Sequence, residues 1–260
     1  MRLDKFLSET GTASRSESKK AARVGGVTVN GVAVKDLSVH IDPDKDRIAY
    51  MDTPVIYQKY IYIMMNKPDG VISSTEDGND KTVLDLLPEK YGRLGLFPCG
   101  RLDRDTTGCL LFAKNFAAYE AAVEKFKVRG VKKLYHAIVV GCYKLARKTI
   151  NAELDGQEAV SKVLREAVGD DASFLKVMIE TGRTNQIRRH LAGDRFPIIG
   201  DRVYGLKNAR DPRLMQVPRQ MLHASTIEMP HPKKLKETIK VHSPLPADFR
   251  AALKLFGMGK

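Results

Sequence analysis

The sequence predicts an α+β protein made of two folded units, the second and larger one built on a largely antiparallel mixed sheet with flanking helices. Helical and strand-like patterns follow one another in mixed blocks instead of strict alternation, which favours this class. At 260 residues the chain suits a small domain plus a larger one. A polar, turn-forming run at residues 42–46 separates the two patterns. We therefore expect domains at residues 1–57, with a linker from about residue 46, and 58–260.

The first unit is predicted to begin with two short helices. Apolar residues recur at helical spacing from Leu3 onward, and Gly11 is expected to end that helix. Ser14 and Glu17 have the spacing of a capping box, which opens a second helix. The glycine pair at residues 25–26 is expected to end it.

The second predicted helix carries a basic face and leads into a hairpin. Arg15, Lys19 and Arg23 are spaced four apart, and Lys20 lies beside them. Residues 27–34 form two short valine-rich runs around an Asn-Gly pair, a strong hairpin signal. On pattern alone, the basic face is either a solvated surface or a contact for a polyanion.

The second unit is predicted to contain most of the strands. Strand-like segments occupy residues 60–65, 71–74, 94–97, 109–113, 134–140, 160–167, 174–179, 219–229 and 236–242, and helical ones 83–87, 116–126, 185–191 and 249–256. Residues 71–74 are expected to return antiparallel to residues 60–65. Thr184 is expected to cap its helix, and Pro88 to end the one before it.

The composition favours an anionic partner. Lys and Arg outnumber Asp and Glu by 44 to 31, for a formal charge of +13, so nucleic acid is the leading expectation. The N-terminus lacks the apolar stretch of a secretory signal and no apolar run is long enough to span a bilayer, so we expect a cytoplasmic protein without membrane contact. Three cysteines and six histidines show no metal-ligand spacing, which predicts no structural metal.

The most informative segment is the nonapeptide at residues 100–108. It places Asp103 between Arg101 and Arg104, in a turn flanked by apolar runs. A carboxylate held by a guanidinium keeps its charge and orientation, so it can serve as a nucleophile or a general base. An alternative is a metal-binding pair of Asp103 and Asp105, although the neighbouring arginines would repel a divalent cation.

Two further segments are candidates for the same site. Tyr135 lies in a predicted strand, where its ring could simply be an ordinary strand aromatic. Arg183, Arg188 and Arg189 lie in or next to a predicted helix, where they could instead form a solvated face. The residue pattern alone does not decide between these interpretations.

Several motifs resemble those of a known family. The run from Gly100 to Asp103, followed by Thr-Thr-Gly at residues 106–108, resembles the signature of the RNA pseudouridine synthases of the ribosomal small subunit pseudouridine synthase A group. Residues 66–70 and 82–88 match the same group. The first 50 residues or so resemble the alpha-L RNA-binding fold, so the likeness extends over nearly the whole chain.

The resemblance implies an intramolecular transferase that converts a uridine of structured RNA to pseudouridine without cofactor or metal. It implies that Asp103 is the catalytic aspartate, attacking C1′ or the base or taking a ribose proton to give a glycal. Tyr135 would stack on the flipped base and assist proton removal from C5. Arg188 would form the salt bridge with Asp103, with Arg183 as the alternative partner or a phosphate contact.

The same resemblance implies how RNA is held. Arg101 would enter the RNA stack and keep the target nucleotide out of it. Arg15, Lys19, Lys20 and Arg23 would meet phosphates rather than bases, which gives affinity and positioning with little sequence readout. The expected partner is ribosomal RNA or a ribosomal assembly intermediate, and the expected oligomeric state is a monomer.

The C-terminal half departs from the small-subunit group. Residues 181–188, 200–205 and 222–224 look more like the large-subunit and transfer-RNA branch, and Asn185 replaces the histidine usual before Gln186. We expect a uridine of small-subunit RNA to be the target, with large-subunit or transfer RNA as alternatives. A non-catalytic RNA-binding assembly factor and metal-dependent RNA cleavage are the rival functions.

Overall fold

The computed structural model describes residues 1–57, 60–74, 80–87, 96–206, 211–232 and 236–259. The chain divides into two compact units, one containing Met1–Tyr62 and the other most of the remaining residues. Across these described ranges, no helix has the length and apolar character needed to cross a membrane.

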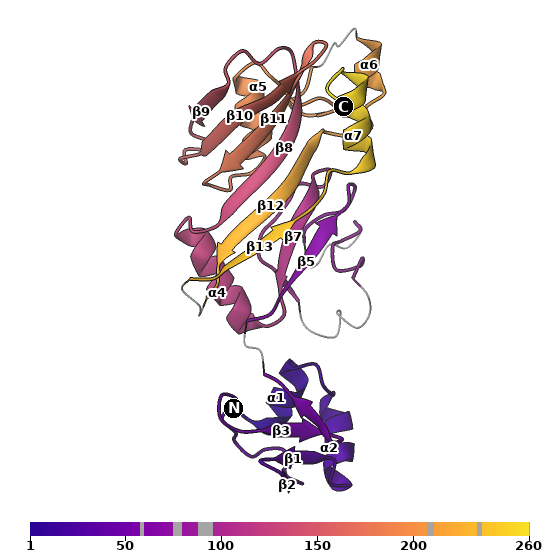
Figure 1. Cartoon of the computed structure of the whole chain (residues 1–260), viewed down its shortest axis with the longest axis vertical. Helices are drawn as coiled ribbons and strands as arrows, with labels where there is room; N and C mark the ends of the chain where they lie inside the picture. The colour runs from indigo at the N-terminus through magenta and orange to yellow at the C-terminus, as the bar shows by residue number, and fades with distance from the viewer. Residues whose placement is uncertain (58–59, 75–79, 88–95, 207–210, 233–235, 260) are drawn as a thin grey trace. The chain divides into compact units, whose positions relative to one another are not determined.

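The first unit combines two helices with a small antiparallel sheet (Figure 1). The helices are α1 (Leu3–Glu9) and α2 (Arg15–Arg23), and the strands are β1 (Val27–Val29), β2 (Val32–Ala33), β3 (Ile48–Tyr50) and β4 (Thr53–Val55). The strand order is β2-β1-β3-β4. Its core is apolar and fully buried around Leu3, Phe6, Leu7 and Val27. The two helices and the hairpin predicted from the sequence are confirmed.

The capping box of α2 forms as predicted. The backbone N–H of Glu17 donates to Ser14 Oγ at 3.3 Å, and the backbone N–H of Ser14 donates to a Glu17 carboxylate oxygen at 2.7 Å. The predicted linker from residue 46 was wrong, because residues 48–55 form β3 and β4. Ile48 is buried in the core and pairs with Val29, so this stretch belongs to the first sheet.

The second unit is built on a nine-stranded sheet. The strands are β5 (Tyr62–Lys67), β6 (Phe97–Pro98), β7 (Thr107–Ala113), β8 (Lys132–Val140), β9 (Arg147–Asn151), β10 (Val160–Val168), β11 (Ala172–Ile179), β12 (Leu222–Pro230) and β13 (Thr238–His242). The main order is β5-β7-β12-β8-β11-β10-β9, with β13 beside β12 and β6 beside β7. Strands β8 to β13 pair antiparallel with one another, whereas β7 and β12 are parallel, so the predicted largely antiparallel mixed sheet is confirmed.

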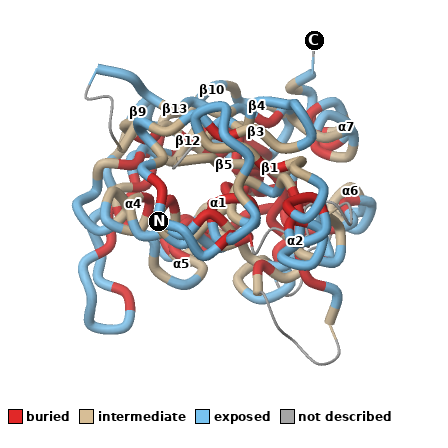
Figure 2. Tube along the Cα trace, turned by 90° about the horizontal axis from the view of Figure 1, so that it is seen from below, coloured by how far each residue is buried: buried red, intermediate tan, exposed pale blue. Residues whose placement is uncertain are grey.

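Helices flank this sheet. They are α4 (Phe116–Lys127), α5 (Gln186–Gly193), α6 (Pro212–Met215) and α7 (Ala247–Leu255). The ring of Phe249 of α7 packs at 6.2 Å from the ring of Phe174 and 6.4 Å from that of His223. Figure 2 shows the buried positions along the chain in red. Since His136 stacks on Phe174, neighbouring Tyr135 of β8 faces away from α7.

Two predicted elements before the nonapeptide were wrong. Residues 71–74 do not pair with β5, because Ile72 instead forms a parallel bridge with Thr82 and exchanges backbone hydrogen bonds with Lys81 and Val83. That pairing uses the backbone of residue 83, so residues 83–87 form turns and no helix. Pro88 lies outside the described residues. Strand β9, which alternates exposed and half-buried residues, has no apolar pattern and was not predicted.

Candidate active site

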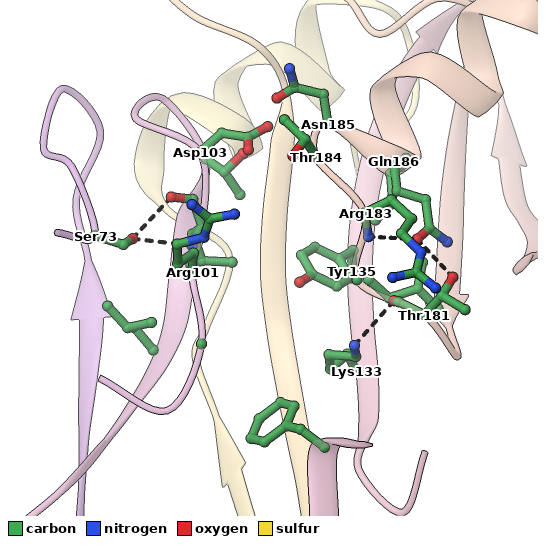
Figure 3. Close-up of a pocket in the computed structure, with 18 of the residues that line it drawn as sticks. Ser73, Arg101, Asp103, Lys133, Tyr135, Thr181, Arg183, Thr184, Asn185 and Gln186 are labelled. Atoms are coloured by element: carbon green, nitrogen blue, oxygen red, sulfur yellow. Dashed lines mark hydrogen bonds between the residues drawn. The ribbon is translucent and has the colours of Figure 1, made fainter. Parts of the chain in front are cut away.

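The nonapeptide lies in a pocket of about 970 Å³ in the second unit. Its walls come from the loop before β7, from β8, and from the segment between β11 and α5. Figure 3 shows Arg101 and Asp103 on one wall, with Tyr135, Lys133 and Arg183 on the other. The structure therefore brings together five residues singled out in the sequence, and these are Arg101, Asp103, Tyr135, Arg183 and Arg188.

Asp103 is held in position by its own loop and by Ser73. The Ser73 hydroxyl donates to the carbonyl oxygen of Leu102 at 2.9 Å and accepts from the Leu102 backbone N–H at 3.1 Å (Figure 3). The backbone N–H of Thr106 donates to the carbonyl of Asp103 at 3.1 Å, which closes the turn. The Asp103 side chain keeps 31% of its surface exposed, so a substrate can reach it.

Lys67 is a buried residue that binds the backbone of the loop containing Asp103. Its fully buried ammonium donates to the carbonyl oxygens of Pro68, Arg104 and Thr106 at 2.8–3.1 Å. Burial lowers the pKa of Lys67 to about 8, although the carboxylates of Asp105, Asp69 and Asp103 act in the opposite direction. The carbonyl acceptors of Arg104 and Thr106 fix the loop on both sides of Asp105, and that of Pro68 ties the ammonium to its own segment.

Arg188 is the partner of Asp103. Its Nη1 atom lies 3.1 Å from Asp103 Oδ2, while its Nε and Nη2 atoms donate to the two carboxylate oxygens of Asp201 at 2.6 and 2.9 Å. The guanidinium also lies over the ring of Tyr204, at 5.1 Å from its centroid. The bidentate contact with Asp201 leaves one edge of the guanidinium to face Asp103.

Asp201 is a fully buried carboxylate that anchors Arg188. The backbone N–H groups of Val203 and Tyr204 both donate to its Oδ1 atom, at 2.9 and 3.0 Å. Burial would raise the pKa of Asp201, but the hydrogen bonds from Arg188 and from these two N–H groups hold it below its usual value. Burial likewise disfavours charge on Arg188, and its contacts with Asp201 and Asp103 outweigh that effect and raise its pKa.

Asn185 accepts a further hydrogen bond from Arg188 and so helps to hold its guanidinium in place. Thr184 was predicted to cap the following helix, but Asn185 occupies the N-cap position in the left-handed region, with φ of 52°. Its side chain makes no cap hydrogen bond, because Oδ1 accepts from Arg188 Nη1 at 2.8 Å and Nδ2 donates to the hydroxyl of Tyr204 at 3.3 Å. Asn tolerates the left-handed region better than most residues, which suits this position.

Tyr135 forms the aromatic wall of the pocket. The residue is 8% exposed, and its hydroxyl oxygen points toward the wall that carries Arg101 (Figure 3). Burial, and secondly the charge of Asp103, raise the pKa of Tyr135. The phenol is therefore protonated at neutral pH.

Arg183 lies in the pocket without pairing with Asp103. Its Nε atom donates to the backbone carbonyl of Glu158 at 3.1 Å. Its backbone N–H donates to Gln186 Oε1, which also accepts from the hydroxyl of Thr181 (Figure 3). Gln186 Nε2 donates to the carbonyl of Val160, so this buried amide ties the loop to β10.

The basic residues predicted on the second helix lie on the surface of the first unit. Arg15, Lys19, Lys20 and Arg23 of α2 are all exposed. Ser18 and Ala21 of the same helix are buried, so the basic side chains project from the opposite side.

Sequence reasoning missed the residues that position this site. Ser73, Lys67 and Asp201 are separated from Asp103 by tens of residues, and each acts on a neighbour through tertiary hydrogen bonds. Asp201 follows a buried apolar pair and a glycine at residues 198–200, and it lies in the run at 200–205 that the sequence singled out only for its likeness to the large-subunit branch. Tyr204 belongs to the same run.

Comparisons with known proteins match two family models. The model described as RNA pseudouridylate synthase matches residues 61–193, and the S4 domain model matches residues 1–48. The first match covers the pocket wall from Ser73 to Arg188.

Curated relatives extend over the chain. Ribosomal large subunit pseudouridine synthase D of Xanthomonas campestris pv. campestris is 32% identical over 256 residues, covering 87% of this chain and 74% of that protein. The uncharacterized RNA pseudouridine synthase YtzG of Bacillus subtilis is 46% identical over 115 residues, covering 44% of this chain and about half (48%) of YtzG.

A solved structure shares the fold. Human RNA Pseudouridylate Synthase Domain Containing 4 superposes with a TM-score of 0.63 at 22% identity, covering 77% of this chain and 92% of the human one. The likeness supports the architecture of the second unit.

Proposed function

The chain belongs to the RNA pseudouridylate synthase family, and from this premise we propose that it converts a uridine of large-subunit ribosomal RNA to pseudouridine at the pocket around Asp103. The observation that carries the proposal is the carboxylate of Asp103, held 3.1 Å from an anchored Arg188 and facing a pocket walled by Tyr135. Pure RNA binding does not require a carboxylate in a site meant for a polyanion.

We propose large-subunit RNA as the substrate because of the curated relatives, although the nonapeptide at residues 100–108 favours small-subunit RNA. The motifs around Asp103 favour small-subunit RNA, whereas the relatives include several proteins named ribosomal large subunit pseudouridine synthase D. The C-terminal segments at residues 181–188, 200–205 and 222–224 also favour the large-subunit branch. Pseudouridine mapping of ribosomal and transfer RNA from a deletion strain tests the choice, since the missing modification names the target.

The reaction needs little from the protein beyond positioning and one reactive carboxylate. The C1′–N1 bond breaks, a C1′–C5 bond forms, the C5 proton leaves and N1 takes up a proton, so no redox partner is required. The carboxylate of Asp103, oriented by Arg188, attacks C1′ or the base or removes a ribose proton. Each of these routes uses the same geometry.

Arg101 and Arg183 are proposed to hold the RNA. Arg101 is exposed on the loop just before Asp103 and can enter the space vacated by a flipped nucleotide. Arg183 donates through Nε to the backbone of Glu158, and its two Nη atoms can donate to a phosphate.

Tyr135 is proposed to act mainly through its ring. Because its raised pKa keeps the phenol protonated, we expect Tyr135→Phe to lower kcat by only about tenfold, the value of one hydrogen bond. Tyr135→Leu removes the stacking surface, which is worth roughly 1–3 kcal/mol per base, and should reduce the rate further. Single-turnover tritium release from RNA labelled at uridine C5 measures both. A loss above about 10³-fold in Tyr135→Phe would instead assign proton removal to the hydroxyl.

The N-terminal unit is proposed as a phosphate-binding domain. The S4 match at residues 1–48 and the synthase match at 61–193 support a division between residues 57 and 58. In this proposal, Arg15, Lys19, Lys20 and Arg23 of α2 contact the RNA backbone.

Substitution of these four residues by glutamine should weaken RNA binding in a salt-dependent manner. The slope of log Kd against log salt concentration should become less steep by about 0.7 for each phosphate that the variant no longer neutralises. Filter binding of transcribed ribosomal RNA at several KCl concentrations measures the slope. Glutamine substitution of Lys144 and Arg147, which are exposed at the start of β9 and just before it, is compared with the Arg15 and Lys19 pair alone as the control for loss of two surface charges. An unchanged slope in the α2 variant would remove this helix from the RNA interface.

Catalysis itself is tested by tritium release from transcribed ribosomal RNA carrying tritium at uridine C5. Release with wild-type protein, in EDTA as well as in Mg²⁺, is the expected result. Absence of release from both ribosomal RNAs and from transfer RNA would contradict the proposal. RNA cleavage that EDTA abolishes, without tritium release, would point to the metal-dependent alternative at Asp103 and Asp105.

A further inference from the structure

A half-buried lysine lies in the pocket next to the proposed catalytic residues. Lys133 precedes Tyr135 by two residues on β8, so both side chains point to the same face of the strand. Its Nζ atom donates to the backbone carbonyl of Thr181 at 3.1 Å (Figure 3). Within the part of the chain that the structure describes, no carboxylate forms an ion pair with Lys133.

The half-buried ammonium of Lys133 has too few polar partners in the protein to offset the loss of its hydration. Burial, and secondly the neighbouring charge of Arg183, lower the pKa of Lys133 to about 8. A lysine has three donors, and one neutral carbonyl satisfies only one of them. Buried charges are normally paired, so an anion is the ligand that this side chain lacks.

An aromatic ring lies beside the lysine. Lys133 Nζ is 5.8 Å from the ring centroid of Phe126, which is half-buried near the end of α4 and lines the same pocket. A cation and an aromatic face at one place complement a nucleotide, since its phosphate can pair with the ammonium and its base can stack on the ring.

The charges around this end of the pocket are mainly positive. Lys127, Arg129 and Arg183 also line it. The acidic groups nearby already have partners, because Glu180 pairs with Lys162 and Glu158 pairs with Arg129. A phosphodiester can therefore approach Lys133 without meeting an uncompensated carboxylate.

The position of Lys133 fits the nucleotide next to the target. Two residues along a strand span about 6.8 Å, roughly twice the rise between stacked nucleotides. A strand whose target base lies against Tyr135 would thus place a neighbouring, unstacked nucleotide at Lys133 and Phe126. A pocket of about 970 Å³ has room for both.

We propose that Lys133 and Phe126 form a second nucleotide subsite, in which Lys133 binds a phosphodiester flanking the target uridine and Phe126 stacks on the adjacent base. The inference rests on the proposed function for the identity of the RNA strand. The subsite selects single-stranded, unstacked RNA next to the modified position, because a base within a helix cannot reach the ring.

The test is the binding of a short fluorescein-labelled oligouridylate between about 50 and 200 mM KCl. Lys133→Met should raise Kd about tenfold and make the salt slope less steep by roughly 0.7. Phe126→Leu should raise Kd by about tenfold with the slope unchanged, because it removes stacking and no charge. Lys133→Arg, which keeps the cation, should retain the wild-type slope.

Lys132→Met is the matched control, because Lys132 is exposed on the opposite face of β8 and pairs with Glu228 on the surface. It should leave Kd and slope unchanged. Should Lys133→Met lose the native circular dichroism spectrum, Lys133→Gln replaces it, since its amide can still donate to the Thr181 carbonyl. A wild-type slope in the neutral variant, or a Kd in Phe126→Leu within about twofold of wild type, would overturn the subsite.

Tritium release by wild-type protein separates this result from the proposed function. Release with unchanged oligouridylate binding in Lys133→Met and Phe126→Leu would reject the subsite alone. Weakened binding in these variants, with no release by wild type from any ribosomal or transfer RNA, would reject the reaction and retain the subsite.

Discussion

Asp103→Asn is expected to abolish pseudouridine formation while RNA binding survives. The amide keeps the shape of the side chain and can still accept a hydrogen bond from Arg188, but it is neither a nucleophile nor a base. Loss of such a group reduces enzyme rates by on the order of 10⁴-fold or more. Removing a negative charge from a site that receives phosphates should leave RNA affinity equal or slightly higher. Tritium release and filter binding on the same RNA measure the two effects.

Asp105→Asn is the matched control for this variant. Asp105 is two residues away in the same loop, but its side chain does not line the pocket, whereas Asp103 does. It should retain activity within a few-fold of wild type. Normal activity in Asp103→Asn would reject the assignment of Asp103, and equal loss in both variants would point to a shared metal instead.

Local signals made much of the fold predictable. The capping box of Ser14 and Glu17 and the Asn-Gly hairpin are set by contacts within a few residues, and both formed as expected. The nonapeptide was also informative, because a carboxylate between arginines is hard to explain by packing. Strand β9 could not be found in this way, since it has no apolar face to mark it.

The positioning of the site depends on contacts that no local pattern contains. Asp201 becomes the anchor of Arg188 only because the turn after residue 198 brings two backbone N–H groups to its carboxylate. Asn185 was expected inside a helix capped by Thr184, yet its side chain binds Arg188 instead of making a cap hydrogen bond. These contacts depend on how distant segments fold together, so they cannot be predicted from the spacing of residues along the chain.

Arg188→Gln is expected to impair both stability and activity. The substitution leaves the buried carboxylate of Asp201 without its cation, and breaking a buried pair in this way costs about 3–5 kcal/mol. In a domain of this size, the midpoint of thermal unfolding should fall by on the order of 10 °C. Asp103 also loses its orienting partner, so the rate should fall roughly 10²-fold even where the variant is folded.

The control for this variant is the neighbouring arginine. Arg189 pairs on the surface with Asp155, whose side chain is 69% exposed, so Arg189→Gln should leave the stability of the protein nearly unchanged. Equal destabilisation by the two substitutions would contradict the anchoring role of Asp201. The double variant Arg188→Gln with Asp201→Asn should recover part of the lost stability, because no unpaired charge remains, but none of the activity.

The pH dependence of the loss distinguishes an unpaired charge from simple loss of packing. In wild type, folding lowers the pKa of Asp201. Its carboxylate therefore adds to the stability of the protein at any pH above the pKa it has in the unfolded chain. This stabilisation is lost only as pH falls through the lower pKa of the folded protein. Without Arg188, burial should raise that pKa, and stability should then decline as pH rises from the unfolded pKa toward the raised one. The difference in unfolding free energy between wild type and Arg188→Gln should therefore be larger at about pH 8 than at about pH 5 in urea titrations. A difference that is independent of pH would mean that the buried carboxylate does not carry the effect.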